Sequence, residues 1–289
     1  MYSVQQLSIF VLGAISLWLW WRELTIRKQS GTGLFGAATR SIRGIGLVDV
    51  LAAAFLVMIA SAIVRQAVQV PTSAVNTFAQ AIALFGFWLL LRTRHPEFSE
   101  WLAPGWTRFR QDVVSGIRGC VLVLPWLLTL NWVLSLLIPY RHSNLDAVRN
   151  STQWADVMSG WFGTVACTGF FEEMLFRGIL QSWLIGLYPL NLFNRPDGLS
   201  KMVLGEFVRE RSQLTMESQG ASWFAVLVTS YLFSLAHFGQ GAAPVPLFLL
   251  SIFLGWLFMK TNSLWSCIVA HMCFNAFTML WVTLEWALG

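Results

Sequence analysis

Eight long runs of mostly apolar residues divide this chain, and they limit the folds that it can adopt more than any other feature. A helix that spans the hydrocarbon core of a bilayer needs about 20 such residues. The runs therefore predict an all-α, polytopic membrane protein of about eight transmembrane helices. The predicted spans are 5–21, 46–64, 74–91, 117–139, 157–187, 221–238, 243–259 and 264–284.

The composition agrees with a bilayer environment. Hydrophobic residues make up 56% of the 289 residues and charged residues only 11%, whereas soluble domains carry about 25% charged residues. Such a chain has too few charges to cover a surface that faces water. The net charge of +5 does not indicate a nucleic-acid partner, because the basic residues lie in separate loops and form no groove-like cluster. The predicted location is an integral, multi-pass position in the membrane, the inner membrane if the cell is bacterial.

Loops that are rich in lysine and arginine alternate along the chain with loops that contain few of them. The loops 22–45, 92–116 and 188–220 hold five, four and four of them, whereas the intervening loops hold one, two and none. Cytoplasmic loops of membrane proteins are enriched in Lys and Arg, so the richer loops are predicted to be cytoplasmic and both termini to lie on the other side. The first run lacks a positively charged n-region and a clear cleavage site, and we interpret it as a retained helix.

The fifth run carries three ionisable side chains within six residues, Glu172, Glu173 and Arg177. Inside a bilayer each costs about 2.5–3.5 kcal/mol on insertion scales, and such groups usually face a cavity or a partner. On an α-helix, Glu173 and Arg177 have the spacing and order that favour an ion pair. Glu172 points about 140° away from Arg177. We therefore predict a structural Glu173–Arg177 pair and a second carboxylate without a counter-charge.

Two later runs each carry a polar stripe. His237 shares a helix face with Ser234, and His271 lies one turn before Asn275. Polar stripes on three helices of an apolar protein are expected to converge on a wet cavity. Taken singly, each histidine is equally well explained as a hydrogen-bonding residue between helices, and the asparagine is better explained in that way. That explanation does not account for Glu172, which has no counter-charge. A carboxylate beside an imidazole suits general-base activation of water.

The three polar motifs occur without the motifs of other hydrolases, since the sequence contains neither HExxH nor GxSxG. Together they resemble the CPBP family of intramembrane proteases, which includes the CAAX prenyl endopeptidases of the Rce1 type. The family motifs EExxxR, FxxxH and HxxxN read EEMLFR at 172–177, FSLAH at 233–237 and HMCFN at 271–275. The resemblance covers about 155–284 and keeps the family's order of motifs.

The chain is expected to consist of two parts, of which the resemblance covers the second. Residues 1–154 would consist of N-terminal transmembrane helices with cytoplasmic basic loops. Residues 155–289 would form the CPBP-like catalytic transmembrane core, with an inserted polar loop at about 188–220 that is longer than the minimal family spacing. Apolar residues at helical spacing between 199 and 208 predict either a short interfacial helix in this insert or a solvated loop.

The resemblance also implies an intramembrane endopeptidase that hydrolyses a peptide bond of a membrane-associated protein or peptide. In the family pattern Glu172 and His237 activate a water molecule, and His271 and Asn275 stabilise the oxyanion. The arginine would pair with the second glutamate of its motif and shape the site. The residues implied at the site are Glu172, Glu173, Arg177, His237, His271 and Asn275.

Two alternatives stay open at this point. Glu172, His237, His271 and Asn275 could hold a zinc ion in a metalloprotease, but zinc sites usually take histidine and carboxylate ligands and not an amide, so no cofactor is favoured. A non-enzymatic transporter or scaffold could instead use the polar stripes as a path for protons or cations.

The predicted helix boundaries conflict with a shared site for the two histidines. They put His237 near the outer end of its helix and His271 about 10 Å from the inner end of another. The histidines can meet if the FSLAHF helix lies deeper and the segment GQGAAPVP enters the membrane as non-helical chain. Otherwise one of the two catalytic roles is wrong.

Overall fold

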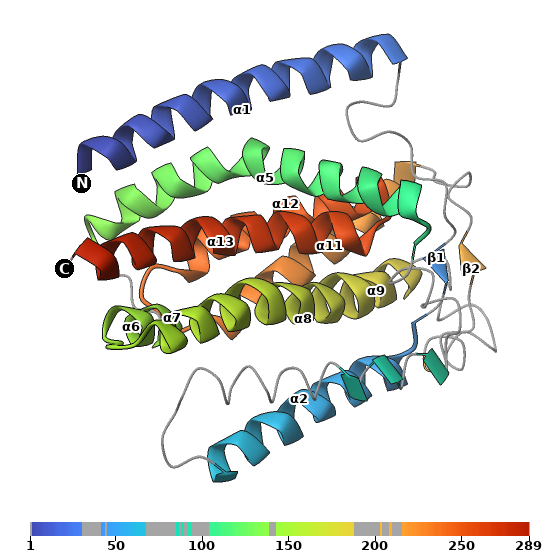
Figure 1. Cartoon of the computed structure of the whole chain (residues 1–289). Coiled ribbons are helices and arrows are strands. Elements are labelled where there is room, and N and C mark those ends of the chain that lie inside the picture. Colours follow the sequence, from blue (N-terminus) through green and yellow to red (C-terminus); the bar gives the residue numbers. More distant parts are fainter. Residues whose placement is uncertain are drawn as a thin grey trace.

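The computed structural model of the protein describes residues 2–30, 42–43, 45–67, 104–138, 143–187, 208–209 and 216–288, together with the positions 85–86, 88–89, 92–93 and 203. Long helices that lie side by side make up most of this part of the chain (Figure 1). The described strands are β1 (Ile42–Arg43) and β2 (Val208–Arg209), which pair antiparallel. Two such short strands form no sheet layer, and the predicted all-α class is confirmed.

Every predicted span except the third coincides with a described helix or helical run. The third span, 74–91, and the interfacial helix predicted between 199 and 208 fall largely outside the described residues. The helices and helical segments are α1 (Tyr2–Ser30), α2 (Leu47–Ala67), α5 (Trp106–Ser135), α6 (Ser143–Arg149), α7 (Trp154–Trp161), η1 (Phe162–Thr168), α8 (Gly169–Glu173), η2 (Met174–Gln181), α9 (Ser182–Leu187), α11 (Met216–Ala236), α12 (Pro244–Thr261) and α13 (Leu264–Leu288).

Several helices have the properties of membrane spans. Among the described residues, α5, α12 and α13 are each long and apolar enough to cross a bilayer, and α2 and α11 contain shorter apolar stretches. Large apolar side chains such as Trp21, Phe55 and Phe224 are exposed on the outside of the bundle. Lipid is the solvent that such a surface requires, and the protein is an integral membrane protein.

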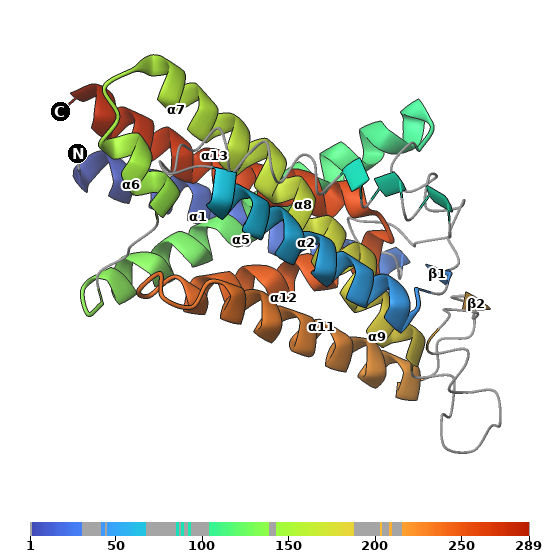
Figure 2. The same cartoon turned by 90° about the horizontal axis from the view of Figure 1, so that it is seen from below.

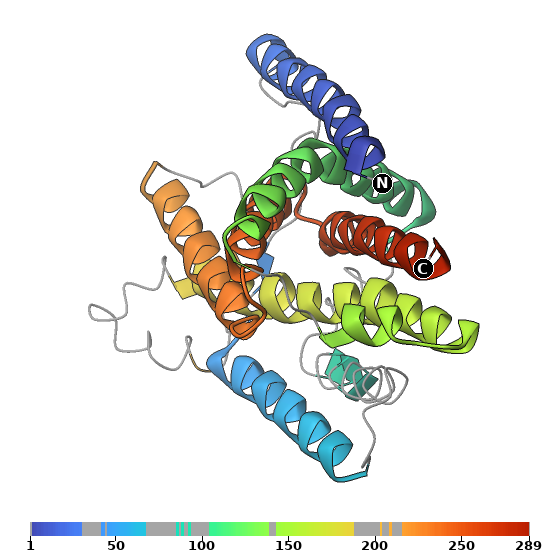
Figure 3. The ribbon, with the colours of Figure 1, turned by 90° about the vertical axis from the view of Figure 1, so that its left-hand side faces the viewer.

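Helix α13 occupies the centre of the bundle and carries two of the predicted site residues. It lies between α5 and the helical run from α7 to α9, as the end-on view in Figure 3 shows. It also packs against α12, with which α5 shares an apolar core. Small residues permit the close crossing of α5 and α13, because a Cβ on Gly116 would lie 2.7 Å from the Ser266 carbonyl oxygen.

The helix ends fall into two groups at opposite ends of the bundle. Both chain termini, α6 and the turn between α11 and α12 point to one end, which we call the terminal end (Figures 1 and 2). The strands β1 and β2 lie at the opposite end, which we call the strand end. The two termini therefore share one side of the molecule, as the alternation of basic loops predicts.

Candidate active site

The helical run that carries the first motif becomes π-helical twice. Segments η1 and η2 are π-helical, and the short α-helix α8 between them bears Glu172 and Glu173. π-helical turns are rare and occur frequently at functional sites. The sequence predicts one continuous helix here, and hydrophobic periodicity contains no signal for the change from α to π geometry.

The predicted pair of Glu173 and Arg177 is present. Arg177 Nη1 donates to Glu173 Oε1 at 2.7 Å, and both side chains are 0% exposed. Arg177 Nη2 also donates to the Ser251 Oγ at 2.8 Å and to the Ser251 carbonyl at 3.1 Å. Ser251 lies on α12 and was not predicted from the sequence. The arginine therefore joins two helices in the dry interior of the bundle.

Glu173 makes a second contact that the sequence did not predict. Its Oε1 atom lies 2.8 Å from His271 Nδ1. Glu173 is ionised beside Arg177 and can only accept a hydrogen bond, so the His271 Nδ1 carries the proton and donates it. His271 Nε2 is then directed to the other side of the ring, where Glu172 Oε2 lies 3.7 Å away. Glu173 thus fixes which nitrogen of His271 faces Glu172.

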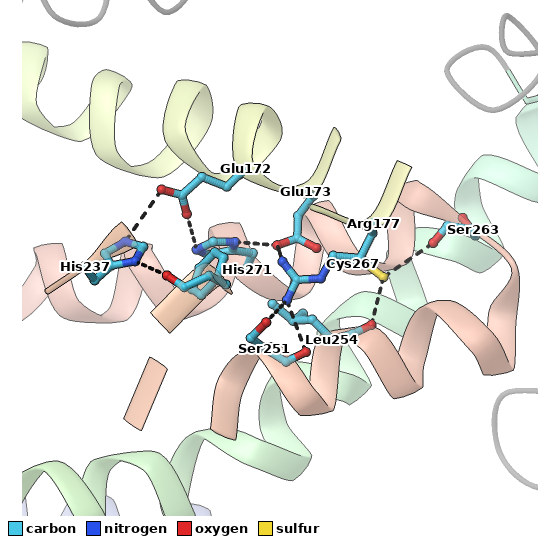
Figure 4. Close-up of polar contacts among 10 residues, drawn as sticks. Glu172, Glu173, Arg177, His237, Ser251, Leu254, Ser263, Cys267 and His271 are labelled. Carbon is cyan, nitrogen blue, oxygen red and sulfur yellow. Dashed lines mark hydrogen bonds and ion pairs between the residues drawn. The ribbon is translucent and has the colours of Figure 1, made fainter. Parts of the chain in front are cut away.

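His237 is oriented in the same way by a backbone group. Its Nδ1 lies 2.8 Å from the carbonyl oxygen of Phe233, and a carbonyl only accepts, so Nδ1 donates. His237 Nε2 lies 3.7 Å from Glu172 Oε1. Each oxygen of Glu172 therefore faces the Nε2 atom of a different imidazole, as Figure 4 shows. At 3.7 Å neither contact is a direct hydrogen bond.

The meeting of the two histidines decides between the alternatives left by the helix boundaries. Helix α11 ends at Ala236, and the chain makes a non-helical turn before α12 begins at Pro244. Gly239 and Gly241 have φ values of 98° and 64° in this turn, which side chains with a Cβ rarely adopt. The turn stops short of the end that the C-terminus reaches (Figures 1 and 2). The predicted difference in depth between the histidines is therefore absent.

Asn275 and Gly169 complete the contacts around α13. Asn275 Nδ2 donates to the carbonyl of Thr164 in η1 at 2.9 Å, which leaves its second N–H available. A Cβ on Gly169 would lie 3.1 Å from Met272 Cγ. The small size of Gly169 therefore permits the close packing of α8 on α13.

A cavity of about 400 Å³ brings the predicted residues together. Glu172, His237, His271 and Asn275 line it, whereas Glu173 and Arg177 lie behind Glu172 in the packed interior. Seven further polar residues line the cavity that the sequence did not single out as site residues. They are Asn131, Arg149, Thr164, Thr168, Gln240, Thr278 and Glu285.

With this geometry established, the chain can be compared with known proteins. A family model described as type II CAAX prenyl endopeptidase Rce1-like matches residues 154–277. These residues form an Rce1-like domain. The matched residues are less than half of the 289, and the match supports the resemblance of the three motifs to this family of endopeptidases. Searches of the curated proteins and of the solved structures found no match.

The cavity extends beyond the Rce1-like domain. All six predicted site residues lie within the matched residues, but part of the wall comes from α5, through Leu127, Leu128 and Asn131. The end of α13 adds Glu285. The N-terminal half of the chain therefore contributes to the site, although its sequence shows no more than apolar helices.

The residues of the Rce1-like domain can be tested for a fit to zinc. A carboxylate and two imidazoles are donor types that catalytic zinc sites take, and their outer Nδ1 atoms are already held by Glu173 and a carbonyl. Among the described residues, however, no group of three or more His, Cys, Asp or Glu side chains is arranged to hold a metal ion. The donor types fit and the arrangement does not, so the chemistry below is derived from the side chains alone.

Proposed function

We propose that the protein is an intramembrane endopeptidase in which Glu172 and His237 activate a water molecule to attack a peptide bond of a membrane-associated substrate. The observation that carries this proposal is the position of Glu172, which lines the cavity with an imidazole Nε2 atom 3.7 Å from each of its oxygens. Arg177 is already engaged by Glu173, so Glu172 is free to take up a proton from water.

The directions of the imidazole protons support separate roles for the two histidines. Nδ1 of His237 is occupied by a carbonyl, so its Nε2 lone pair can accept a hydrogen bond from the attacking water. His271 donates through Nδ1 to Glu173, so its Nε2 atom is directed toward Glu172 and the cavity. When Nε2 carries a proton, it donates to the developing oxyanion, and the spare N–H of Asn275 is the second donor.

The two protons of the water molecule then have defined destinations. Glu172 takes the first as the hydroxide oxygen forms a bond to the substrate carbonyl carbon. The carbonyl oxygen becomes the oxyanion that His271 and Asn275 stabilise. When the tetrahedral intermediate collapses and the C–N bond breaks, Glu172 returns its proton to the leaving amine. The second proton leaves with the new carboxyl group, and Glu172 is regenerated as a carboxylate.

The membrane proteome tests this function without knowledge of the substrate. In cells that contain Glu172→Gln protein in place of the wild type, we expect at least one membrane-associated precursor to accumulate and its shorter product to disappear. Quantitative proteomics of the membrane fraction measures both. Equal amounts of every precursor and product in the two strains would count against proteolysis. Coupled ion flux without any cleavage product would favour the transporter alternative.

A chelator separates the metal-free mechanism from the zinc alternative. We expect the purified protein to cleave its precursor at an undiminished rate after dialysis against a chelator, because side chains supply every proton-transfer step. The measurement is the cleavage rate together with the metal content of the protein. Loss of cleavage that zinc restores, with one bound metal per chain, would replace this mechanism by that of a metalloprotease.

A further inference from the structure

Two of the four cysteines lie against each other between α5 and α13. The Cys120 thiol of α5 donates a hydrogen bond to the sulfur of Cys273 on α13. Cys120 is 4% exposed, and Cys273 is a partly buried residue that packs against the same apolar core. Both are free thiols. A disulfide has strict limits on the distance between its Cβ atoms, and two thiols in contact come closest to meeting them.

The contact follows from the register of the two helices. Both run from the strand end to the terminal end (Figure 1). A Cβ on Gly116 of α5 would lie 2.7 Å from the Cβ of Val269 on α13, so the backbones nearly touch at this level. Cys120 and Cys273 each follow four residues later, about one turn further along the same helix face. The close approach of the two backbones therefore brings the thiols together.

The other two cysteines have different surroundings. Cys267 Sγ donates to the carbonyl oxygens of Leu254 at 3.4 Å and Ser263 at 3.6 Å. Cys167 lies on η1 and is 7% exposed. All four cysteines belong to the part of the chain that the structure describes, and among them the hydrogen bond between two thiols joins Cys120 to Cys273. We call this pair the dithiol.

The dithiol lies behind the candidate active site. Cys273 is two residues from His271 and two from Asn275, and two residues correspond to about 200° around an α-helix. The thiol and these two cavity-lining side chains therefore project from opposite sides of α13. Helix α5 also contributes to the cavity wall, through Asn131 among others. A covalent bond between the thiols would fix the separation of two helices that line the cavity.

We propose that the dithiol is a redox site, which a two-electron oxidant of the quinone or azo class converts to a disulfide. The S–H bonds of both cysteines break, one S–S bond forms, and two electrons and two protons pass to the oxidant. Because Cys273 is only partly buried, the oxidant can reach one of the two sulfurs. The disulfide ties α5, from the N-terminal half, to the Rce1-like domain at 154–277. This chemistry goes beyond the proposed proteolysis and does not depend on it.

Counting thiols tests the redox site in the full-length protein, purified in detergent. After treatment with diamide, an azo compound, and removal of the excess, the denatured wild type should contain two titratable thiols in place of four. Mass spectrometry of the non-reduced digest should find the peptides of Cys120 and Cys273 linked. Cys167→Ala should fall from three thiols to one, whereas Cys120→Ala should keep three. Four remaining thiols in the wild type, or a link through Cys167 or Cys267, would overturn the proposal.

Thermal unfolding of the same samples gives a second measurement. A cross-link between residues far apart in the sequence restricts the unfolded chain and so stabilises the folded one. The oxidised wild type should therefore unfold at a higher temperature than the reduced wild type, and Cys167→Ala should show the same difference. Cys120→Ala should unfold at one temperature in both states. A difference that persists in Cys120→Ala would contradict the assignment of the disulfide to this pair.

Discussion

Replacing Glu172 by glutamine should lower the rate of substrate cleavage by about 10²–10⁴-fold, which is the usual contribution of a general acid–base group. Glutamine keeps the size and the hydrogen-bonding atoms of the side chain but cannot take a proton from water. Because the carboxylate lines a cavity and has no arginine partner, the variant should insert and fold normally. The measurement is single-turnover cleavage of the accumulated precursor by purified protein in detergent.

Asp156→Asn is a matched control for this variant. It makes the same change from acid to amide on the helical run that carries Glu172, but Asp156 is exposed in the first turn of α7 and does not line the cavity. Its cleavage rate should equal that of the wild type. Full activity of Glu172→Gln would remove Glu172 from the role of base.

Replacing Arg177 by methionine should lower the free energy of unfolding by about 3–5 kcal/mol, the typical cost of leaving one member of a buried ion pair without its partner. Glu173 would remain fully buried with its charge uncompensated, since it is 0% exposed. The double variant Glu173→Gln/Arg177→Met should recover part of this loss, because no buried charge remains. Thermal or denaturant unfolding in detergent micelles measures the difference.

The exposed pair of Arg149 and Glu285 provides the comparison for this stability effect. Both side chains are about 40% exposed, and surface ion pairs contribute about 0–1 kcal/mol. Arg149→Met should therefore change the free energy of unfolding far less than Arg177→Met. Equal losses in the two variants, or no recovery in the double variant, would contradict a stabilising role for the buried pair.

Much of this arrangement follows from local sequence. The apolar runs predict the helices because a bilayer leaves few alternatives for the backbone. The spacing of Glu173 and Arg177 predicts their ion pair because residues four apart share a helix face. The same reasoning separates Glu172 from the arginine, and the structure shows Glu172 turned toward the two histidines.

Other features depend on contacts between distant parts of the chain. Ser251 and Arg177 are 74 residues apart, and Asn275 and Thr164 are 111 apart, so no helical period connects them. The π-helical segments reflect packing that periodicity does not encode. The sequence misplaces His237 in depth because hydropathy defines where an apolar run ends and not the depth at which the helix lies. The catalytic roles of Glu172, His237, His271 and Asn275 stay predictions until the variants are measured.

A single oxygen atom in this protein serves two purposes. Glu173 Oε1 accepts from both Arg177 and His271, so it joins the helices and sets the histidine tautomer at the same time. A substitution that strengthens the fold here, such as an apolar replacement of the buried pair, would release the imidazole. Selection for stability and selection for turnover therefore oppose each other at this position. Variants stabilised elsewhere in the bundle, away from α8, would escape that conflict.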